Sequence, residues 1–582
     1  MATLTETARR SRLISALLYV QSLALFGFFS LDLFPHFIRK LGVQANPTFF
    51  FRDETATILV ASCLFLSARS IKLRRRRAWI FATTLQTLLI VFSVIRSVHI
   101  FLELNRNPHL FLQTLGLSRL VFEIVILALL LRYRNIFKTI ADPYTRRQGV
   151  IFFIRSSLLA LLLGVVIIYF DRHSFLAPVG LGQAIEITIK GLVGVSGPVL
   201  FVSVARQERL ELLLGGLGIL IAVGTLIRFL KPALLKSALS SENAHLVRGL
   251  LEHSSKRDSL SYFALRDNKS VVWSPNMKAV IPYSVRSSVM ISTGDPIGDQ
   301  ESWPAAMAAF LNTAEMHAWI PAIYGCSEEA GEIWVRETGF DSLEIGDEAV
   351  VVVKDFTTEG PVMKNVRQTL NRINRLGYTA KSAFVRDLDE RFREDLAEKM
   401  QQWRKSQDER GFSMALGRFC DPIDPDCLIT WCERENEVVS MLQFVPWGDN
   451  SVSLDLMRRA PNADTGVNEL MIQQTINFVK PLGFEYVSLN FASFRSIFEK
   501  GKKLGAGPVA RVMRKILIFF SHFVQIESLY RFNAKFAPLW EPRYIVFPSI
   551  GNIVRVGYAI LRIEGLFPEF SEMLPKRAKH KL

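Results

Sequence analysis

The sequence has few of the residues that build metal centres and disulfide frameworks. Among its 582 residues there are only five cysteines, and no two of them have the C-x-x-C spacing that frames a zinc site. The nine histidines are scattered, and no H-E-x-x-H motif occurs. We therefore expect no metal ion, and we expect reduced or buried thiols at Cys63, Cys326, Cys420, Cys427 and Cys432.

Two other signals are also missing. The sequence contains no Gly-x-x-x-x-Gly-Lys-[Ser/Thr] loop, which would bind the phosphates of ATP. We expect no cleavable signal peptide, because the first apolar run is too long for one and no small-residue cleavage site follows it cleanly. This run follows Arg9, Arg10 and Arg12 and predicts a first membrane span instead.

The composition combines many apolar residues with an excess of positive charge. Apolar residues make up 49% of the chain, phenylalanine alone occurs 43 times, and the formal net charge is +16. This combination is typical of a membrane protein that contacts acidic lipid, nucleic acid or both.

Long apolar runs fill the first 235 residues or so. Each approaches or exceeds the roughly 20 residues that a helix needs to cross the hydrocarbon core of a membrane. A further apolar stretch at about 190–204 contains several glycines and is either a seventh span or a re-entrant segment. We predict six spans, at about residues 13–34, 54–71, 78–103, 117–133, 150–170 and 212–230.

Lysine and arginine are distributed unevenly among the connections between these runs. The second connection carries the run Arg74–Arg77 and the fourth carries Arg132, Arg134 and Lys138, whereas the first and third are less basic. Basic connections lie in the cytoplasm. With six spans, the N-terminus and everything after about residue 240 are therefore expected to be cytoplasmic.

Two arginines, Arg96 and Arg155, fall within the apolar runs. An arginine inside a membrane is costly and often functional, but a long side chain can also reach the interface. A transport function would depend on these two positions.

The composition changes at about Leu246, where charges become frequent. Short β-rich runs such as Ser270–Trp273, Ala349–Val353 and Val452–Leu456 alternate with helical patterns, which predicts an α/β or α+β domain.

Two helices are predicted in this part of the chain. Apolar residues at steps of three and four predict one from Met363 to Leu376, with Gly377 as its C-terminal cap. Its other face is basic, which suits either solvent or bound phosphate. A second helix, from Leu388 to about Gln407, carries charges of both signs and is expected to be solvated.

Several ordered blocks in the C-terminal half resemble the phosphatidylglycerol lysyltransferases, the MprF-like aminoacyl-phosphatidylglycerol synthases. The resemblance runs from about Tyr262 to Tyr544, and its specificity comes from the order of the blocks rather than from any one of them. The blocks are Gly294–Gly298, Glu337–Phe340 with Ile345–Ala349, Arg367–Tyr378, Ser453–Arg459 with Gly466 and Glu469, and Tyr530–Tyr544.

The resemblance implies two acetyltransferase-like (GNAT) lobes in tandem after a set of membrane helices. We accordingly expect a polytopic transmembrane domain at 1–238, a first GNAT-like lobe at 239–382, and a second lobe at 383–582 with the catalytic site and a basic C-terminal tail. The overall fold class is therefore an α-helical membrane domain followed by a cytosolic α/β or α+β domain.

The family takes an amino acid, most often lysine or alanine, from its tRNA and attaches it to the headgroup hydroxyl of phosphatidylglycerol. The resemblance thus implies an aminoacyltransferase in the bacterial plasma membrane, with aminoacyl-tRNA (lysyl-tRNA favoured) and phosphatidylglycerol as partners. The product is less negative, which lowers the attraction of cationic antimicrobial peptides to the membrane. The oligomeric state is open, with a homo-oligomer among the options.

The sequence departs from longer members of the family in two respects. Its membrane region is shorter, so we expect synthase activity without autonomous lipid flipping. No lysyl-tRNA synthetase module follows the transferase half, so we expect charged tRNA to come from a separate enzyme.

The ester of an aminoacyl-tRNA is already activated, so transfer needs a polarised hydroxyl and a stabilised oxyanion but no cofactor. Asp455 and Arg458 match the D-x-x-R positions of the family. Asp455 is expected to polarise the hydroxyl or to hold the α-ammonium, and Arg458 to bind the lipid phosphate or the oxyanion. Residues three apart on a strand face opposite sides, so the pair requires a bulge or a strand end near Met457.

Other polar residues of the matching blocks are assigned supporting roles. Glu469, in the first turn of a helix that begins near Gly466, either orients Arg458 or the amine, or merely complements the helix dipole. Asp295 is expected to shape a turn. Phosphates of tRNA or lipid are expected at Arg367, Arg372, Arg375, Lys535 and Arg543.

Other functions are open at this point. Use of acetyl-CoA is disfavoured, because the segment Arg459–Gly466 between the strand and the helix has a single glycine with which to hold a pyrophosphate. Transfer of alanine, transfer to another acceptor lipid, a non-catalytic membrane scaffold and a lipid transporter are the alternatives.

Overall fold

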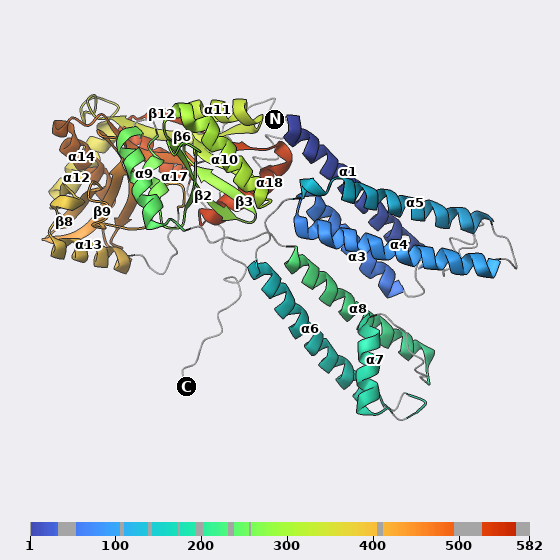
Figure 1. The fold of residues 1–582 in the computed structure, drawn as a ribbon. Coiled ribbons are helices and arrows are strands. Elements are labelled where there is room, and N and C mark those ends of the chain that lie inside the picture. Colours follow the sequence, from blue (N-terminus) through green and yellow to red (C-terminus); the bar gives the residue numbers. More distant parts are fainter. Residues whose placement is uncertain are drawn as a thin grey trace. The chain divides into compact units, whose positions relative to one another are not determined.

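Figure 1 shows the fold of the chain in a computed structural model. The chain divides into two compact units, of which the first consists almost entirely of Met1–Ala233 and the second holds Leu234–Glu315 and Trp319–Leu582. The structure describes residues 2–32, 54–104, 110–137, 143–172, 175–177, 179–193, 202–230, 238–254, 258–403, 411–493 and 526–565.

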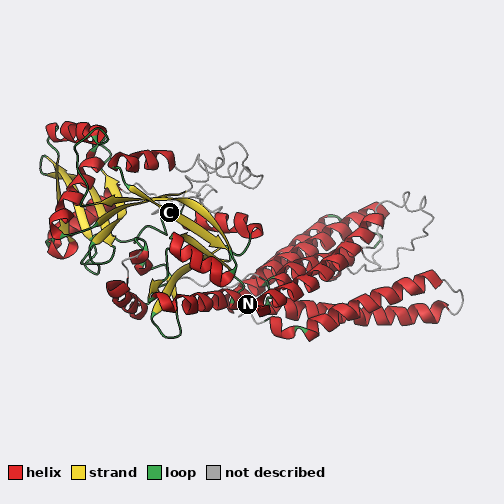
Figure 2. Ribbon diagram, turned by 90° about the horizontal axis from the view of Figure 1, so that it is seen from above, coloured by secondary structure: helices red, strands yellow, loops and turns green. Residues whose placement is uncertain are grey.

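The first unit is built from helices (Figures 1 and 2). Long helices overlap all six of the predicted apolar runs, and a shorter helix, α7, follows α6. The bounds are α1 (Ala2–Asp32), α3 (Glu54–Lys72), α4 (Arg76–Leu104), α5 (Leu110–Arg132), α6 (Pro143–Phe170), α7 (Leu181–Val193) and α8 (Val204–Phe229).

Among the described residues, three helices are long and apolar enough to cross a membrane, over Arg76–Ile95, Arg147–Phe170 and Arg209–Phe229. The count of six spans therefore stays a prediction. Arg155 is exposed on α6, whereas the side chain of Arg96 lies outside the described residues. The stretch at 190–204 begins in α7 and lies mostly outside them.

Glycines allow α6, α7 and α8 to approach one another closely. A Cβ atom added at Gly164 would lie 2.3 Å from Cγ2 of Thr188, and one added at Gly218 would lie 1.9 Å from the backbone oxygen of Leu192. Such close contact through small residues is typical of helices that pack within a membrane.

A buried carboxylate on α5, Glu123, is paired within its own helix and hydrogen-bonded to α4. Glu123 is 1% exposed and accepts hydrogen bonds from Nε of Arg119 (2.9 Å) and from the hydroxyl of Ser93 (2.8 Å). An isolated charge at such a position would be very costly, so these donors make the carboxylate tolerable inside the bundle.

The second unit is a mixed β-sheet with helices on both faces (Figure 2). Its strands are β1 (Ser270–Trp273), β2 (Ala279–Arg286), β3 (Val289–Thr293), β4 (Ile297–Gly298), β5 (Ile320–Cys326), β6 (Asp341–Val352), β7 (Thr379–Phe384), β8 (Leu428–Arg434), β9 (Glu437–Pro446), β10 (Ser451–Arg459), β11 (Tyr486–Ser493) and β12 (Leu539–Phe547). Its helices are α9 (Ser241–Ser254), α10 (Trp303–Met316), α11 (Glu328–Thr338), α12 (Lys364–Arg375), α13 (Glu390–Trp403), α14 (Val467–Val479), α17 (Ile526–Asn533) and α18 (Ile553–Ile563).

The helices cover the two faces of the sheet in a regular way. On one face, α9, α13 and α18 pack against the strands. On the other face, α10 and α11 cover the first half of the sheet and α12 and α14 cover the second half. Alternation along the strands produces this division: in β3, Val289 and Ile291 face the first layer, while Met290 between them faces the second.

The strand order is β1-β2-β3-β5-β12-β6-β11-β10-β9-β8-β7, with β4 paired to β2. Among these described pairs only β3–β5 and β10–β11 are parallel, and α10 and α14 respectively connect their strands. The sheet thus contains the same β–α–β unit twice, in keeping with the rule that parallel neighbours need a crossover connection.

The local sequence predictions can be compared with these elements. The helix predicted at Met363–Leu376 is confirmed as α12, and the N–H of Gly377, at φ +83°, donates to Asn374 O at 3.1 Å beyond the end of the helix. The predicted strand Ser270–Trp273 is confirmed as β1. The second predicted helix is confirmed over Glu390–Trp403 as α13, and its last predicted residues, 404–407, lie outside the described part of the chain.

The sheet is continuous across the predicted boundary between the two lobes. That boundary, at residues 382 and 383, falls inside β7, and β12 from the C-terminal part pairs with β5 and β6. The domain limits of 1–238, 239–382 and 383–582 stay predictions, and the two halves share one sheet.

The close approach of α7 and α8 can be tested with two alanine variants. Gly218→Ala should destabilise the bundle by about 1–3 kcal/mol because the new Cβ would overlap a backbone carbonyl, which lowers the melting temperature of the detergent-solubilised full chain. Gly216→Ala in the same helix is the matched control, since a Cβ there would meet nothing within 4 Å. Equal melting temperatures for the two variants would contradict this packing.

Candidate active site

The candidate site lies where the parallel strands β10 and β11 separate. Their ladder runs from Ser451 opposite Tyr486 to Ser453 opposite Ser488 and then ends. Beyond that point the side-chain amide of Asn490, a residue with φ +67°, donates to the backbone carbonyl of Leu454 at 2.9 Å. Divergence of two parallel strands frees backbone groups and side chains in the middle of a sheet, which is a common place for a binding site.

A β-bulge in β10 positions Asp455 at this divergence. The pairing of β10 with β9 shifts between Leu454 and Leu456, so that Asp455 is the extra residue. Leu454 packs on the α12 and α14 side of the sheet, whereas Leu456 packs on the side of α9, α13 and α18. Alternation beyond the bulge then places Arg458 on the same side as Leu456.

The carboxylate of Asp455 accepts a hydrogen bond at each of its two oxygens. Oδ1 accepts from the backbone N–H of Leu416 at 2.8 Å, and Oδ2 accepts from Nε2 of Gln443 at 2.6 Å. Both donors direct hydrogens at the carboxylate, which accepts through each of its two oxygens. Gln443 lies on the neighbouring strand β9, on the same side of the sheet as Asp455. The bulge at Asp455 therefore brings Asp455 and Arg458 to one side of the sheet, as a shared site requires.

Gln443 is itself fixed at both ends of its amide. Its Oε1 accepts from the N–H of Cys420 (2.7 Å), and its Nε2 also donates to the carbonyl of Arg418 (2.9 Å). Sequence reasoning missed this residue, because a single glutamine on a strand carries no signal of its own. It is buried and fully hydrogen-bonded, so it can hold the carboxylate in one orientation.

The segment 411–420 passes over Asp455 with its backbone anchored by side chains. Besides the bonds from Asp455 and Gln443, the N–H groups of Phe412 and Ser413 donate to Glu564, at 2.8 and 3.1 Å. Arg266 donates to the carbonyl of Ala415 at 2.8 Å. Sequence reasoning also missed this loop.

Arg458 is half-buried, and its guanidinium has no hydrogen-bond or ion-pair partner among the residues that the structure describes. A half-buried guanidinium without an internal acceptor is suited to an anionic ligand. The site therefore contains the fixed carboxylate of Asp455 and the guanidinium of Arg458, which makes no hydrogen bond or ion pair with a described residue. Both groups lie on the same side of the sheet.

Glu469 occupies a different place. It is buried in the first turn of α14 and accepts a hydrogen bond from Nζ of Lys535 at 2.8 Å. Its neighbour Asn468 donates to the sulfur of Met457 at 2.8 Å, which places this helix end against β10 on the α12 and α14 side. The structure therefore brings Glu469 together with Lys535 rather than with Arg458.

The basic residues of α12 lie beside the connection from β10 to α14. Arg372 donates to the carbonyl of Thr465 and, at 3.2 Å, to its hydroxyl. Arg367 donates to the carbonyls of Thr358 (2.7 Å) and Gly360 (3.1 Å), while Arg375 is exposed. Arg372 and Arg375 are thus accessible to a phosphate, and Arg367 is partly committed to the preceding loop.

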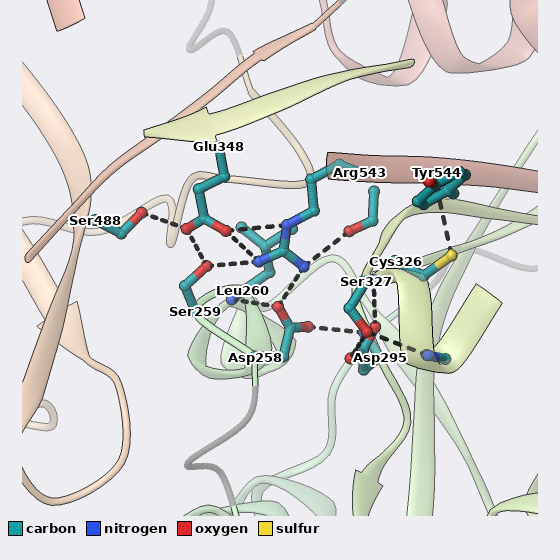
Figure 3. Close-up of polar contacts among 12 residues, drawn as sticks. Asp258, Ser259, Leu260, Asp295, Cys326, Ser327, Glu348, Ser488, Arg543 and Tyr544 are labelled. Carbon is teal, nitrogen blue, oxygen red and sulfur yellow. Dashed lines mark hydrogen bonds and ion pairs between the residues drawn. The ribbon is translucent and has the colours of Figure 1, made fainter. Parts of the chain in front are cut away.

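Arg543 is buried in the middle of the sheet within a network of charges, which Figure 3 shows in close-up. Its Nε and Nη2 donate to Glu348, the former at 3.0 Å, and Nη2 also donates to the hydroxyl of Ser259 at 2.9 Å. Its Nη1 donates to Asp258 (2.7 Å) and to the carbonyl of Gly325 (3.2 Å). These bonds use all five N–H groups, so the phosphate predicted for Arg543 would have to displace an existing partner.

The same network fills the place where the first pair of parallel strands, β3 and β5, separates. The β3–β5 ladder ends at Thr293 opposite Tyr324, next to Gly325. Asp258 accepts from the N–H of Asp295 at 2.7 Å, and Asp295 accepts from the N–H and the hydroxyl of Ser327, at 2.8 and 2.6 Å (Figure 3). Protein side chains thus fill the position in the first half that corresponds to the Asp455 site in the second.

Burial and neighbouring charges shift several pKa values around this network. Burial by itself would lower the pKa of Arg543, but Glu348, Asp258 and Asp295 outweigh it and raise that pKa. Burial raises the pKa of Asp295 to about 7, and the charge of Asp258 adds to the rise. Burial lowers the pKa of Lys269, which donates to Thr293 Oγ1 at 2.8 Å, to about 7.

The fold of the second unit is similar to that of a solved structure. The structure titled as that of L-PGS from Bacillus licheniformis matches 57% of this chain and 98% of that chain, with a TM-score of 0.50 and 20% sequence identity. At this identity the match shows the fold alone.

Sequence comparison identifies the family. Residues 248–547 match the family model described as "Phosphatidylglycerol lysyltransferase, C-terminal", and the chain belongs to this family. Asp455, Arg458, Glu469, Lys535 and Arg543 all lie within the matched residues.

Curated relatives are named for the biosynthesis of lysylphosphatidylglycerol. The lysylphosphatidylglycerol biosynthesis bifunctional protein LysX of Mycobacterium marinum is 36% identical over 506 residues, which are 86% of this chain and 45% of the relative. The LysX protein of Mycolicibacterium vanbaalenii is 43% identical over 369 residues, 63% of this chain and 33% of the relative. The chain thus spans less than half the length of these relatives.

The structural role of Arg543 can be tested by truncation. Arg543→Ala leaves two buried carboxylates without their shared cation, a change that typically costs about 3–5 kcal/mol, so the full chain should melt at a clearly lower temperature. The control is Arg336→Ala, which removes an exposed pair with Glu337 and should have little effect. If Arg543→Ala melts like Arg336→Ala, the network does not stabilise the sheet.

Proposed function

We propose that the chain is a membrane enzyme that transfers an aminoacyl group, lysyl favoured, from aminoacyl-tRNA to the headgroup hydroxyl of phosphatidylglycerol. The observation that carries the proposal is the Asp455 site, which lies within the residues that match the lysyltransferase family. There a fixed carboxylate and the guanidinium of Arg458, which no described residue engages, share one side of the sheet where β10 and β11 diverge.

The reaction is an ester exchange and balances without a cofactor. The lipid hydroxyl oxygen attacks the carbonyl carbon of the aminoacyl ester, the bond from that carbon to the ribose oxygen breaks, and the hydroxyl proton passes to the ribose oxygen. The protein needs to bring the two substrates together and to stabilise the negative oxygen of the tetrahedral intermediate.

Asp455 and Arg458 suit the two charges that arise in this reaction. Because both oxygens of the Asp455 carboxylate are held as acceptors, the group is suited to bind an ammonium group of the aminoacyl moiety or to orient the lipid hydroxyl. Arg458 offers a planar set of donors for the lipid phosphate or for the oxyanion. Glu469 at the start of α14 forms a second charged pair with Lys535, and its neighbour Asn468 holds this helix end against β10.

The remaining basic residues are proposed to bind the donor. Arg372 and Arg375 on α12 present positive charge beside the Arg459–Gly466 connection, and Arg367 extends the same face. A basic helix face of this kind attracts the phosphates of tRNA without reading its sequence. Arg543 acts in our proposal through the sheet that it stabilises.

The proposal places the protein in the bacterial plasma membrane with the second unit in the cytoplasm, where charged tRNA is found. Two tandem GNAT-like lobes and six spans belong to this proposal. Addition of a lysyl group gives the lipid two more positive charges at neutral pH and thus reduces the negative surface potential that attracts cationic antimicrobial peptides.

Mass spectrometry of lipids tests the proposal. In a host that lacks aminoacyl lipids, expression of the full chain should yield a phosphatidylglycerol species heavier by one aminoacyl residue, and the increment names the amino acid. Asp455→Asn should lower its amount by roughly two orders of magnitude or more, whereas Asp395→Asn, in a surface pair on α13, should not. Absence of any such lipid from a well-expressed, membrane-inserted chain would overturn the proposal in favour of a scaffold, a transporter or another acceptor.

The orientation of Asp455 by Gln443 predicts a second result. In Gln443→Glu, an oxygen replaces the amide nitrogen that donates to Asp455, so transfer should slow by roughly 10- to 100-fold at neutral pH. The rate should partly recover as the pH is lowered, because the introduced carboxyl group, once protonated, again supplies a donor. Initial rates in isolated membranes from pH 5.5 to 8 measure this, with Gln401→Glu on the exposed side of α13 as the control. A loss that is independent of pH would indicate damage to the fold instead of a positioning role.

A further inference from the structure

The helix α18 is anchored on the sheet by one of its faces. Val556, Ala559 and Ile560 are buried and join the core on the side of α9 and α13. This face packs against β2, β3 and β5, so the orientation of the helix on the sheet is fixed.

The opposite face of α18 is apolar and exposed. Val554 is 71% exposed and Tyr558 43% exposed, and Ile550 in the preceding turn is 55% exposed. Val554 and Tyr558, four residues apart, lie along one line of α18, and Ile550 lies in the 3-10 turn that precedes the helix. Among the side chains that the structure describes, no other helix of the second unit presents more than one exposed large apolar residue.

The charge that accompanies this apolar line has one sign. Arg555 and Arg562 are the charged residues of the helix, and the guanidinium of Arg562 lies 5.9 Å from the centre of the Tyr558 ring. The nearest acid along the chain, Glu564, is buried and accepts from the N–H groups of Phe412 and Ser413. An apolar line bordered by arginines, on a helix that carries no carboxylate of its own, has the chemistry of a helix that lies on anionic lipid.

We propose that the outer face of α18 rests on the surface of an anionic bilayer. Ile550, Val554 and Tyr558 would enter the boundary between headgroups and acyl chains, and Arg562 would face lipid phosphates. Arg555, whose Nη2 donates to the carbonyl of Ser287 at 3.4 Å, would add positive charge beside them. The inference extends the proposed function, which requires a lipid acceptor, by assigning the surface through which the second unit meets the membrane.

The outer face of α18 is connected to the candidate site through Glu564 and the loop at 411–420. Glu564 follows the last turn of α18 and holds Phe412 and Ser413, at the start of the loop whose Leu416 N–H binds Asp455. A helix seated on the membrane therefore also fixes the loop that orients the carboxylate.

A spin label at position 554 tests the proposal in the full chain. All five native cysteines are buried, so a cysteine introduced by Val554→Cys can be labelled selectively. Val362→Cys is the matched control, because Val362 is also 71% exposed but lies in a loop that precedes α12. The chain is reconstituted in vesicles with and without phosphatidylglycerol, and the accessibility of each label to oxygen and to a water-soluble nickel chelate is measured.

We expect the label at 554, and not the label at 362, to be shielded from nickel and accessible to oxygen, and more so in vesicles that contain phosphatidylglycerol. A label at 554 as accessible to nickel as that at 362 would overturn the proposal. So would a label shielded from both reagents, which would indicate a protein cover. The readout does not need catalysis, so a chain that makes aminoacyl lipid with a water-exposed label at 554 refutes this inference alone.

Discussion

The buried charges around Arg543 hold the second unit together across its whole sequence. Arg543 is 285 residues from Asp258 and 195 residues from Glu348, yet it donates to both carboxylates. A shift of β12 by one residue would turn the guanidinium to the other face of the sheet and leave two buried carboxylates without a cation. This loss is far more costly than the loss of an apolar contact. The ion network therefore specifies the register of the C-terminal strand between β5 and β6, and with it the continuity of the sheet.

The two β–α–β units use their strand divergences differently. In the first, the polar side chains of the protein itself occupy the position beyond Thr293 and Tyr324. In the second, the position beyond Ser453 and Ser488 holds a bulge, and the fixed Asp455 carboxylate lies there with the half-buried Arg458 nearby on the same side. One divergence thus stabilises the sheet, and we propose the other as the substrate site, which is why we assign the chemistry to the second half.

Local patterns in the sequence predicted local structure well. The spacing of apolar residues predicted α12, and β-rich composition predicted β1, because both depend on neighbours a few residues away. The partners of Arg543 could not be predicted, since they lie far away in the sequence and only the position of β12 in the sheet brings them together. Gln443 was missed for the same reason, and the pairing of Glu469 with Lys535 depends on a helix end and a segment 66 residues apart. Strand geometry alone required a bulge or a strand end near Met457, and the bulge lies at Asp455, between Leu454 and Leu456.

The central claim is that an ester-linked aminoacyl group passes from tRNA to lipid at the Asp455 site. The most direct measurement uses the purified full chain in vesicles of phosphatidylglycerol, supplied with tRNA that carries radiolabelled lysine and with no ATP. Our account predicts that the label moves into the lipid extract and co-migrates with an aminoacyl phosphatidylglycerol. If the label stays on the tRNA, or is released only as free lysine, while the chain is folded and inserted, the account is contradicted.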